Sequence, residues 1–467
     1  MPKELELTSQ RAGDLIATVM RYVADAIDRK GTLPVEGSIS ADALAGLVEP
    51  PPETGAQLDD LLGDVFGDYP STSLDATSPG FMGYVPGGGI FHAAVADLIA
   101  DTLNRYVGVS AVGGAYVQIE SNVVRWFCEF MGLPQGSGGY LTSGGSLANW
   151  GALIAAREKH LGEQLSEGVI YVSDQAHHCV AKAAKLAGIR AGNVRVLACD
   201  ADFRLSPGRV LAEVEADRAR GLTPFMLVAS AGTTNTGAVD PLAPLAGAAR
   251  DAGLWFHVDG AYGGFFNITE RGRAALNGID QADSIALDPH KTLFLPYGTG
   301  ALLVRRQSDL HAAHASQADY LPPPSEAEAV VDFSDISPEL TRPFRGLRVW
   351  LPLKMHGVGV FRRYLDEKLD LALQLCAALE ANPQIEVLAE PMLSILAFAC
   401  RGETEAHANS RSREVLSAIN ARGRVMLTGT MLGSRFAIRV AVVSYRTHEE
   451  QIGMLLEDLD AALGNVY

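Results

Sequence analysis

The sequence predicts an α/β protein, with a mostly parallel sheet covered by helices on both faces and a smaller α+β domain after it. From about residue 85 to 345, short apolar runs alternate with Ala-rich helical stretches such as Val180–Ala187 and Pro244–Ala252. The apolar runs are Val169–Ser173, Val194–Cys199, Phe225–Ser230, Leu254–Asp259, Ser284–Asp288 and Gly300–Arg305. Strands that are apolar almost throughout are typical of parallel sheets, because helices cover both of their faces.

The N-terminal segment, residues 1–80, is predicted to be helical. Thr8 can cap a helix, and the apolar residues after it recur with the helical period. These residues are Ala12, Leu15, Ile16, Val19, Met20, Val23, Ala24 and Ile27. So continuous a stripe upstream of the core must pack on something, and a partner subunit is one candidate.

Residues 81–345 form the predicted large domain and residues 346–467 the small one. Leu321–Glu339 is rich in Pro, Glu and Asp, so we expect a mobile lid there. Gly346–Leu379 predicts one or two long helices, with a kink at Pro352. The small domain is expected to add strands at Ile395–Cys400, Val425–Leu432 and Arg435–Val443, and a terminal helix near His448–Leu463.

The composition argues against several classes of protein. A chain of 467 residues that is 48% hydrophobic can bury a large core. Its net charge of −17 is unsuited to a nucleic-acid groove or an anionic membrane surface. Met1–Gln10 lacks a signal-peptide core, and no apolar window is long enough to span a membrane. Five scattered cysteines without CxxC spacing indicate a reducing compartment and no structural zinc, so we expect a soluble cytoplasmic protein.

Polar groups gather at the predicted carboxyl ends of four strands. They are Asp174, His177 and His178 after the first run, Gly232, Thr233 and Thr234 after the third, His257 and Asp259 in the fourth, and Asp288, His290 and Lys291 after the fifth. Ligands of open parallel sheets bind beyond these ends. One such strand end is ordinary, but four together predict a binding site.

Lys291 is the most informative of these residues. It directly follows a strand that should be buried, where a lysine is costly unless it is paired or used chemically. A surface lysine in a turn is the plain alternative. Asp259 is likewise a carboxylate at the end of an apolar run, and its plain alternative is a helix cap.

The loop Thr142–Ser146 contains Gly144 and Gly145 and stands before a helical run, Ala148–His160. Paired glycines leave backbone N–H groups accessible, and the helix N-terminus adds a positive dipole end, which together suit a phosphate. A purely structural Gly-Gly turn is the alternative.

Together these groups match the needs of pyridoxal 5'-phosphate (PLP). This cofactor requires an amine to form an aldimine, a carboxylate to keep the ring nitrogen protonated, a flat side chain over the ring and an anion cradle. On these residues the chain resembles the group II PLP-dependent decarboxylases, typified by aromatic-L-amino-acid decarboxylase. The matching motifs are SDQAHHCVAKAAKLAG (173–188), AGTTNTGAVD (231–240), WFHVDGAYGG (255–264), LDPHKTLFLPYGTGALLV (287–304) and LTRPFRGLRVWLPLKMHGVGVF (340–361).

The resemblance implies a fold-type I PLP enzyme that is a homodimer with a shared active site, and a role for each matched residue. Lys291 would form the aldimine, Asp259 would pair with the ring nitrogen, and His177 would stack on the ring. The remaining contacts would be Thr234 near the cofactor, Ala261 beneath the ring, and Gly145, Ser146 and His290 at the phosphate, with Asp288 beside them. The implied reaction is decarboxylation of an L-amino acid, with an aromatic one favoured.

Two departures from the family's pattern bear on the reaction. The family's lid carries a tyrosine that protonates the α-carbon after CO2 leaves, and a gap-free count back from Leu340 and Phe344 puts Phe333 there. Because phenylalanine has no proton to give, the alternative reaction is decarboxylation with oxidative deamination to an aldehyde. Aromatic specificity is not secured either, since Tyr106–Ser110 departs from the bulky residues of aromatic decarboxylases.

Other classes of protein compete with this interpretation. An aminotransferase or lyase shares the cofactor but not the Asp-Pro-His-Lys and Ser-Asp-Gln-Ala-His motifs. A metal-dependent hydrolase could use His177, His257, Asp259 and His290, since His257 and Asp259 share a strand face, but it leaves Lys291 unexplained. A non-catalytic binding module would leave all of these groups unused.

Overall fold

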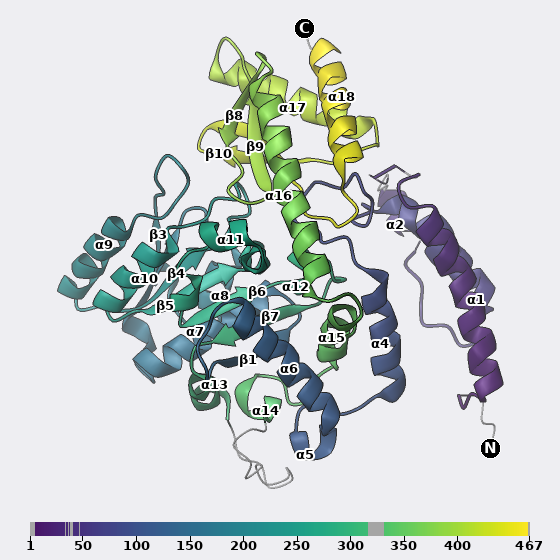
Figure 1. Ribbon diagram of the computed structural model, residues 1–467, viewed down its shortest axis with the longest axis horizontal. Helices are drawn as coiled ribbons and strands as arrows, with labels where there is room; N and C mark the ends of the chain where they lie inside the picture. The colour runs from purple at the N-terminus through teal and green to yellow at the C-terminus, as the bar shows by residue number, and fades with distance from the viewer. Residues whose placement is uncertain are drawn as a thin grey trace.

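The computed structural model describes residues 5–32, 34–35, 37, 41–45, 47–315 and 331–465. Figure 1 shows a large domain built around a sheet, a small domain above it, and the helix α1 set apart from the sheet. The long helix α16 (Val358–Glu380) runs from the large domain to the small one.

The large domain contains a seven-stranded sheet in the order β1-β7-β6-β5-β4-β2-β3. The strands are β1 (Gly138–Thr142), β2 (Gly168–Ser173), β3 (Val194–Leu197), β4 (Thr223–Ser230), β5 (Trp255–Gly260), β6 (Ser284–Leu287) and β7 (Gly300–Val304). Neighbours from β6 to β3 are parallel, whereas β7 is antiparallel to both β6 and β1. The predicted fold class is confirmed. Strand β1 was not predicted, because two glycines begin it and leave only a short apolar run.

Helices cover both faces of this sheet. On one face lie α7 (Gly145–Leu161), α8 (Cys179–Leu186) and α13 (Gln307–His314), and on the other α6 (Ala115–Phe130), α9 (Pro207–Ala219) and α10 (Leu242–Asp251). Because strand residues alternate between faces, Leu227 and Val228 of β4 belong to separate apolar cores. Further helices of the large domain are α4 (Phe91–Leu103), α5 (Ser110–Gly113), α11 (Glu270–Ala275) and α12 (Pro289–Thr292).

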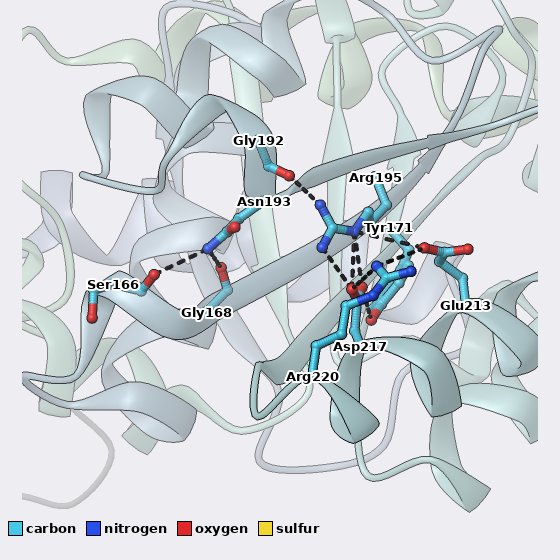
Figure 2. Close-up of polar contacts among 9 residues, drawn as sticks. All are labelled: Ser166, Gly168, Tyr171, Gly192, Asn193, Arg195, Glu213, Asp217 and Arg220. Atoms are coloured by element: carbon cyan, nitrogen blue, oxygen red, sulfur yellow. Dashed lines mark hydrogen bonds and ion pairs between the residues drawn. The ribbon is translucent and has the colours of Figure 1, made fainter.

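A buried carboxylate joins the outer strands of the sheet to α9. Figure 2 shows Asp217, whose side chain is fully buried, between Arg195 of β3, Arg220 and Tyr171 of β2. Arg195 Nη2 lies 2.6 Å and Arg220 Nη1 3.1 Å from Asp217 Oδ1, and the Tyr171 hydroxyl donates to Oδ2 at 3.0 Å. Burial alone would raise the pKa of Asp217, but these donors outweigh it and hold the pKa below its ordinary value. The network stabilises the edge of the sheet.

The small domain follows α15 (Arg345–His356) and α16. Its antiparallel sheet has the order β10-β11-β9-β8; α17 packs on this sheet, and α18 packs against α17. These elements are β8 (Ile385–Ala389), β9 (Ile395–Cys400), β10 (Thr428–Leu432), β11 (Arg435–Ala441), α17 (Glu405–Ala421) and α18 (Glu449–Asn465). The expected kink at Pro352 is not where the helix breaks: α15 continues through Pro352, and Gly357, with φ of 72°, separates α15 from α16.

The N-terminal helix α1 (Ser9–Asp28) begins as predicted, since Thr8 Oγ1 accepts from the Arg11 N–H at 3.3 Å. None of its residues, all of which the structure describes, is buried. The short helices α2 (Ala41–Ala45) and α3 (Leu58–Gly63) follow, and Tyr22 of α1 bonds to Asp59 of α3. Across the described part of the chain, no helix is both long and apolar enough to cross a membrane.

The predicted lid, Leu321–Glu339, is only partly visible, because residues 316–330 lie outside the described residues. Its second half is a packed element. Helix α14 (Phe333–Ile336) buries Phe333 and Ile336 in the core, and the Arg342 guanidinium lies 4.5 Å from the centre of the Phe333 ring. Ser334 N donates to Gly108 O at 3.0 Å, so the segment after residue 330 is anchored to the large domain.

Candidate active site

A cavity of about 330 Å³ opens at the carboxyl ends of β4, β5 and β6, beside the N-terminus of α7. Nine of the ten predicted site residues line it: Gly145, Ser146, His177, Thr234, Asp259, Ala261, Asp288, His290 and Lys291. The parallel register explains the convergence, since Ser230 of β4 pairs with Asp259 of β5. Four strand ends and one helix N-terminus therefore deliver their polar groups to one place.

Phe333 is the predicted residue that the structure does not bring to this cavity. Its side chain is 1% exposed and is covered by Arg342 within the core of its own subunit. In this arrangement the ring does not line the cavity of its own chain.

Lys291 lies on the single-turn helix α12 (Pro289–Thr292), directly after β6. Its Nζ is 2.9 Å from Asp288 Oδ2, and the side chain is 25% exposed, toward the cavity. Burial alone would lower the pKa of Lys291, but the carboxylates of Asp288 and Asp259 outweigh it and raise the pKa above its ordinary value. Without a ligand the amine is therefore a cation between two carboxylates.

The two carboxylates differ in their hydrogen bonds. Asp259 accepts from Asn149 Nδ2 at 3.2 Å and from the Ala261 N–H at 3.1 Å, and burial raises its pKa. Asp288 is 2% exposed, and its Oδ1 has no hydrogen-bond partner among the described residues. A buried carboxylate oxygen without a donor is costly, so it favours a bound group that supplies one.

The loop at the start of α7 fits a phosphate. A Cβ on Gly145 would stand 3.0 Å from both Ala261 Cβ and Asp288 Oδ2, so a side chain there would fill the space that gives access to the backbone. The first N–H groups of a 17-residue helix have no acceptor within it and carry its positive dipole end. His290 donates from Nδ1 to Thr299 O at 2.7 Å, which fixes its ring beside this loop, and burial lowers its pKa.

His177 offers a flat and uncharged ring. The Cys179 N–H donates to His177 Nδ1 at 3.3 Å, which leaves the proton on Nε2. Burial lowers the pKa of His177 below its ordinary value, against the opposing effect of Asp259. The neighbouring His178 is exposed and does not line the cavity.

Sequence reasoning missed four residues that line the cavity: Leu147, Asn149, Cys179 and Tyr262. The Tyr262 hydroxyl lies 2.9 Å from Ser394 Oγ and accepts from the Ser394 N–H, so it joins the site to the small domain. Asn149 stands four residues after Gly145 on α7, and this helical spacing was the signal that could have found it.

The metal-hydrolase alternative loses a proposed ligand in this geometry. Both ring nitrogens of His257 are engaged, Nδ1 by Ser284 Oγ and Nε2 by Asn149 Oδ1, each at 2.8 Å. No group of three or more metal-ligating side chains occurs within the described ranges.

A parallel sheet that brings a lysine, a buried carboxylate and a glycine-lined helix N-terminus to one cavity defines the class of fold-type I PLP enzymes. Residues 46–401 match the family described as "Pyridoxal-dependent decarboxylase conserved domain". The chain belongs to this family, and PLP is its cofactor.

Known relatives resemble the chain over nearly its full length. An aromatic-L-amino-acid decarboxylase of Bacillus atrophaeus is 32% identical over 99% of this chain and 97% of its own. A phenylacetaldehyde synthase of Arabidopsis thaliana is 30% identical over 92% of this chain and 91% of its own. The crystal structure of Oryza sativa TDC with PLP and tryptamine superposes with a TM-score of 0.94 at 26% identity, covering 98% of each chain.

Proposed function

We propose that this enzyme removes the carboxylate of an aromatic L-amino acid as CO2 and releases the amine, with PLP held on Lys291. One observation carries the proposal: Lys291 and Asp259, from adjacent strand ends, face the cavity that Gly145 and Ser146 close at its phosphate-binding end. The relatives named for aromatic decarboxylation support the substrate class.

When bound, PLP supplies a conjugated ring that accepts the electron pair left on the α-carbon as CO2 departs. Lys291 would hold the cofactor covalently. Asp259 would pair with the ring nitrogen and keep it protonated, which would strengthen the ring as an electron acceptor. His177, neutral and flat, would cover one face of the ring.

The other residues of the site orient the cofactor. Gly145, Ser146 and His290 would hold the phosphate, Ala261 would lie beneath the ring and Thr234 near it. Asp288 keeps the Lys291 amine charged while no cofactor is attached, because its Oδ2 is 2.9 Å away.

We propose that the enzyme is a homodimer whose two subunits share each active site. Supporting this, α1 carries Leu15, Ile16, Met20 and Ile27, each more than a third exposed in the single chain. Helix α4 similarly exposes Phe91, Val95, Leu98, Ile99 and Leu103. Apolar faces of this size are typical of surfaces that another subunit covers. Five unpaired cysteines support the reducing cytoplasm as its location.

Phe333 bears on the product that follows loss of CO2. The gap-free count puts it at the position of the family's lid tyrosine, and phenylalanine has no proton to give. In the single chain its ring is packed against Arg342. Phe333 therefore supports the aldehyde as the alternative product.

The second candidate product is an aldehyde, favoured by the likeness to the phenylacetaldehyde synthase of Arabidopsis thaliana. The experiment that separates the two supplies tryptophan, tyrosine, phenylalanine and, as a non-aromatic control, glutamate to the PLP-loaded enzyme. Amine, aldehyde, CO2 and hydrogen peroxide are measured side by side. We expect amine and CO2 in equal amounts from an aromatic substrate. Aldehyde with peroxide would overturn the amine assignment, and CO2 from glutamate alone would overturn the substrate class.

A further inference from the structure

Five buried side chains form one hydrogen-bonded chain that ends on Asp259. Trp255 Nε1 donates to Ser284 Oγ at 2.7 Å, Ser284 Oγ lies 2.8 Å from His257 Nδ1, His257 Nε2 lies 2.8 Å from Asn149 Oδ1, and Asn149 Nδ2 donates to Asp259 Oδ2 at 3.2 Å. Each of the five residues is 9% exposed or less. Trp255, Ser284 and His257 have no role in the proposed reaction.

The fold explains why these residues meet. Trp255, His257 and Asp259 alternate along β5 and therefore share one face of the sheet. Ser284 is the register partner of His257 on the parallel strand β6. Helix α7 packs against both strands and brings Asn149 onto this face.

The hydrogen bonds of this series have one donor-to-acceptor direction. An indole N–H can only donate, so the Ser284 hydroxyl accepts a hydrogen bond from Trp255 and donates one to His257 Nδ1. The Asn149 amide is fixed independently, because its Nδ2 also donates to Gly145 O at 2.8 Å. A flipped amide would place its oxygen against two other acceptor oxygens. Asn149 Oδ1 must therefore accept a hydrogen bond from the N–H group at His257 Nε2.

His257 is suited to this role because it stays neutral. Burial lowers its pKa to about 3, so at ordinary pH the ring carries a single proton, on Nε2. Every donor in the chain then points toward Asp259.

We propose that Asn149 is a positioning residue for the cofactor. Ser284 and His257 fix the Asn149 amide, and this amide orients the Asp259 carboxylate toward the ring nitrogen of PLP. The proposal rests on the pairing of Asp259 with that nitrogen. Asn149 occupies Oδ2 and the Ala261 N–H occupies Oδ1, so both oxygens are fixed by donors. Hydrogen bonds to the charged form of a carboxylate also favour that form.

Binding to the cofactor-free protein tests this directly, with PLP compared to its analogue in which carbon replaces the ring nitrogen. Asn149→Leu should weaken PLP binding about tenfold, because one charge-assisted hydrogen bond to Asp259 is lost. The same variant should leave the affinity for the carbon analogue unchanged, since that ring has no nitrogen for Asp259 to hold. Equal losses for both ligands, or no loss for either, would overturn the proposal.

Asn193→Leu is the matched control. Asn193 is also a buried asparagine whose amide makes two bonds, to Ser166 O at 3.1 Å and Gly168 O at 3.0 Å, but it lies near the sheet edge, outside the cavity (Figure 2). The Asn193→Leu variant should bind PLP and its carbon analogue as tightly as wild type does. Wild-type protein that binds neither ligand would instead contradict the proposed function, so the two failures are distinguishable.

A far link of the chain gives a second comparison. Ser284→Ala should weaken PLP binding in the same selective way but less, by about threefold, because His257 loses only the partner that fixes its tautomer. Ser412→Ala is its control, since the Ser412 hydroxyl is fully buried in the small domain and also makes two hydrogen bonds. A selective loss in Ser412→Ala, or none in Ser284→Ala, would contradict a chain that reaches Asp259 from Ser284.

The tautomer of His257 can be read without any change to the site. Nitrogen-labelled histidine in the wild-type, cofactor-free protein should show one ring that keeps its proton on Nε2 from about pH 5 to 9, assigned by its loss in His257→Gln. A proton on Nδ1, or titration of that ring near its ordinary pKa, would reverse the chain and overturn the proposal even if the variants fail to fold.

Discussion

Single residues set the charge balance of the site. Without a cofactor, the Lys291 cation is the positive partner of both Asp288 and Asp259. A buried carboxylate without a cationic partner is costly. In the proposed function, the protonated ring nitrogen of PLP would be the cationic partner of Asp259 once Lys291 holds the cofactor.

The first prediction concerns Lys291. Lys291→Ala should abolish turnover and the absorbance of the lysine-bound cofactor, because no other amine lies in the described lining of the cavity. The protein should remain folded by circular dichroism. Lys182→Ala, on the exposed face of α8, is the control and should behave as wild type. Retained absorbance and activity in Lys291→Ala would sink the assignment.

Asp259→Asn should reduce turnover on the order of 1000-fold, because a neutral amide cannot keep the ring nitrogen protonated. The volume hardly changes and Asn149 keeps a partner oxygen, so we expect a melting temperature within a few degrees of wild type. Steady-state kinetics and thermal unfolding on the same preparation check both parts. Near-normal turnover would show that Asp259 only caps the following turn.

The share of aldehyde in the product is predicted to depend on Phe333. Phe333→Tyr supplies the phenol that the family's lid tyrosine would provide, so any aldehyde and hydrogen peroxide that wild type makes should fall at least about tenfold relative to the amine. Amine, aldehyde and peroxide are measured side by side. Wild type that makes only amine, with no change in Phe333→Tyr, would show that this position does not decide the product.

Among the secondary-structure elements, those with a strong local pattern could be predicted and those without one could not. The six predicted strands of the large sheet are near-continuous apolar runs, and each is present. Strand β1 begins with two glycines, and β8 is partly exposed, so neither carries such a pattern. Local sequence does not show that the Asp-Phe-Ser-Asp-Ile turn of α14 is covered by Arg342, which follows it in the chain. Lys291 and Asp259, in contrast, followed from strand ends alone.

An element-scale prediction concerns the Asp217 network at the sheet edge. Asp217→Asn should lower the free energy of unfolding by about 3 kcal/mol at pH 7, because it leaves the guanidinium groups of Arg195 and Arg220 without their shared carboxylate. Asp202→Asn removes an ion pair whose carboxylate is 68% exposed, so it should change stability little.

The pH dependence of that effect has a definite sign. The folded pKa of Asp217 lies below the unfolded value of 3.8, so its contribution is fully present above that value. The contribution is lost as the pH falls through the folded pKa. The stability gap between wild type and Asp217→Asn should therefore shrink below about pH 4 in urea unfolding. A gap that stays constant down to pH 2 would show that Asp217 acts through packing alone.

At the scale of the whole molecule, the single chain leaves apolar surface that its own core does not use. Helix α1 lies away from the sheet in Figure 1, and its twenty residues include no buried one. An isolated amphipathic helix of this length is marginal in water, so its stability must come from packing. A second copy of the chain is the partner that the proposed homodimer provides.

The last prediction tests that dimer through the apolar face of α1. Met20→Glu places a charge in the middle of the stripe. Because a dimer would bury this carboxylate at a cost in free energy, the dimer dissociation constant should rise at least about tenfold. Sedimentation at several concentrations measures this directly, and activity should fall with the dimer because the proposed site is shared. Ala17→Glu adds the same charge at an exposed position outside the stripe, so it should leave mass and activity unchanged. An unaltered dimer in Met20→Glu, or a monomer in wild type that is fully active, would show that the stripe serves another contact.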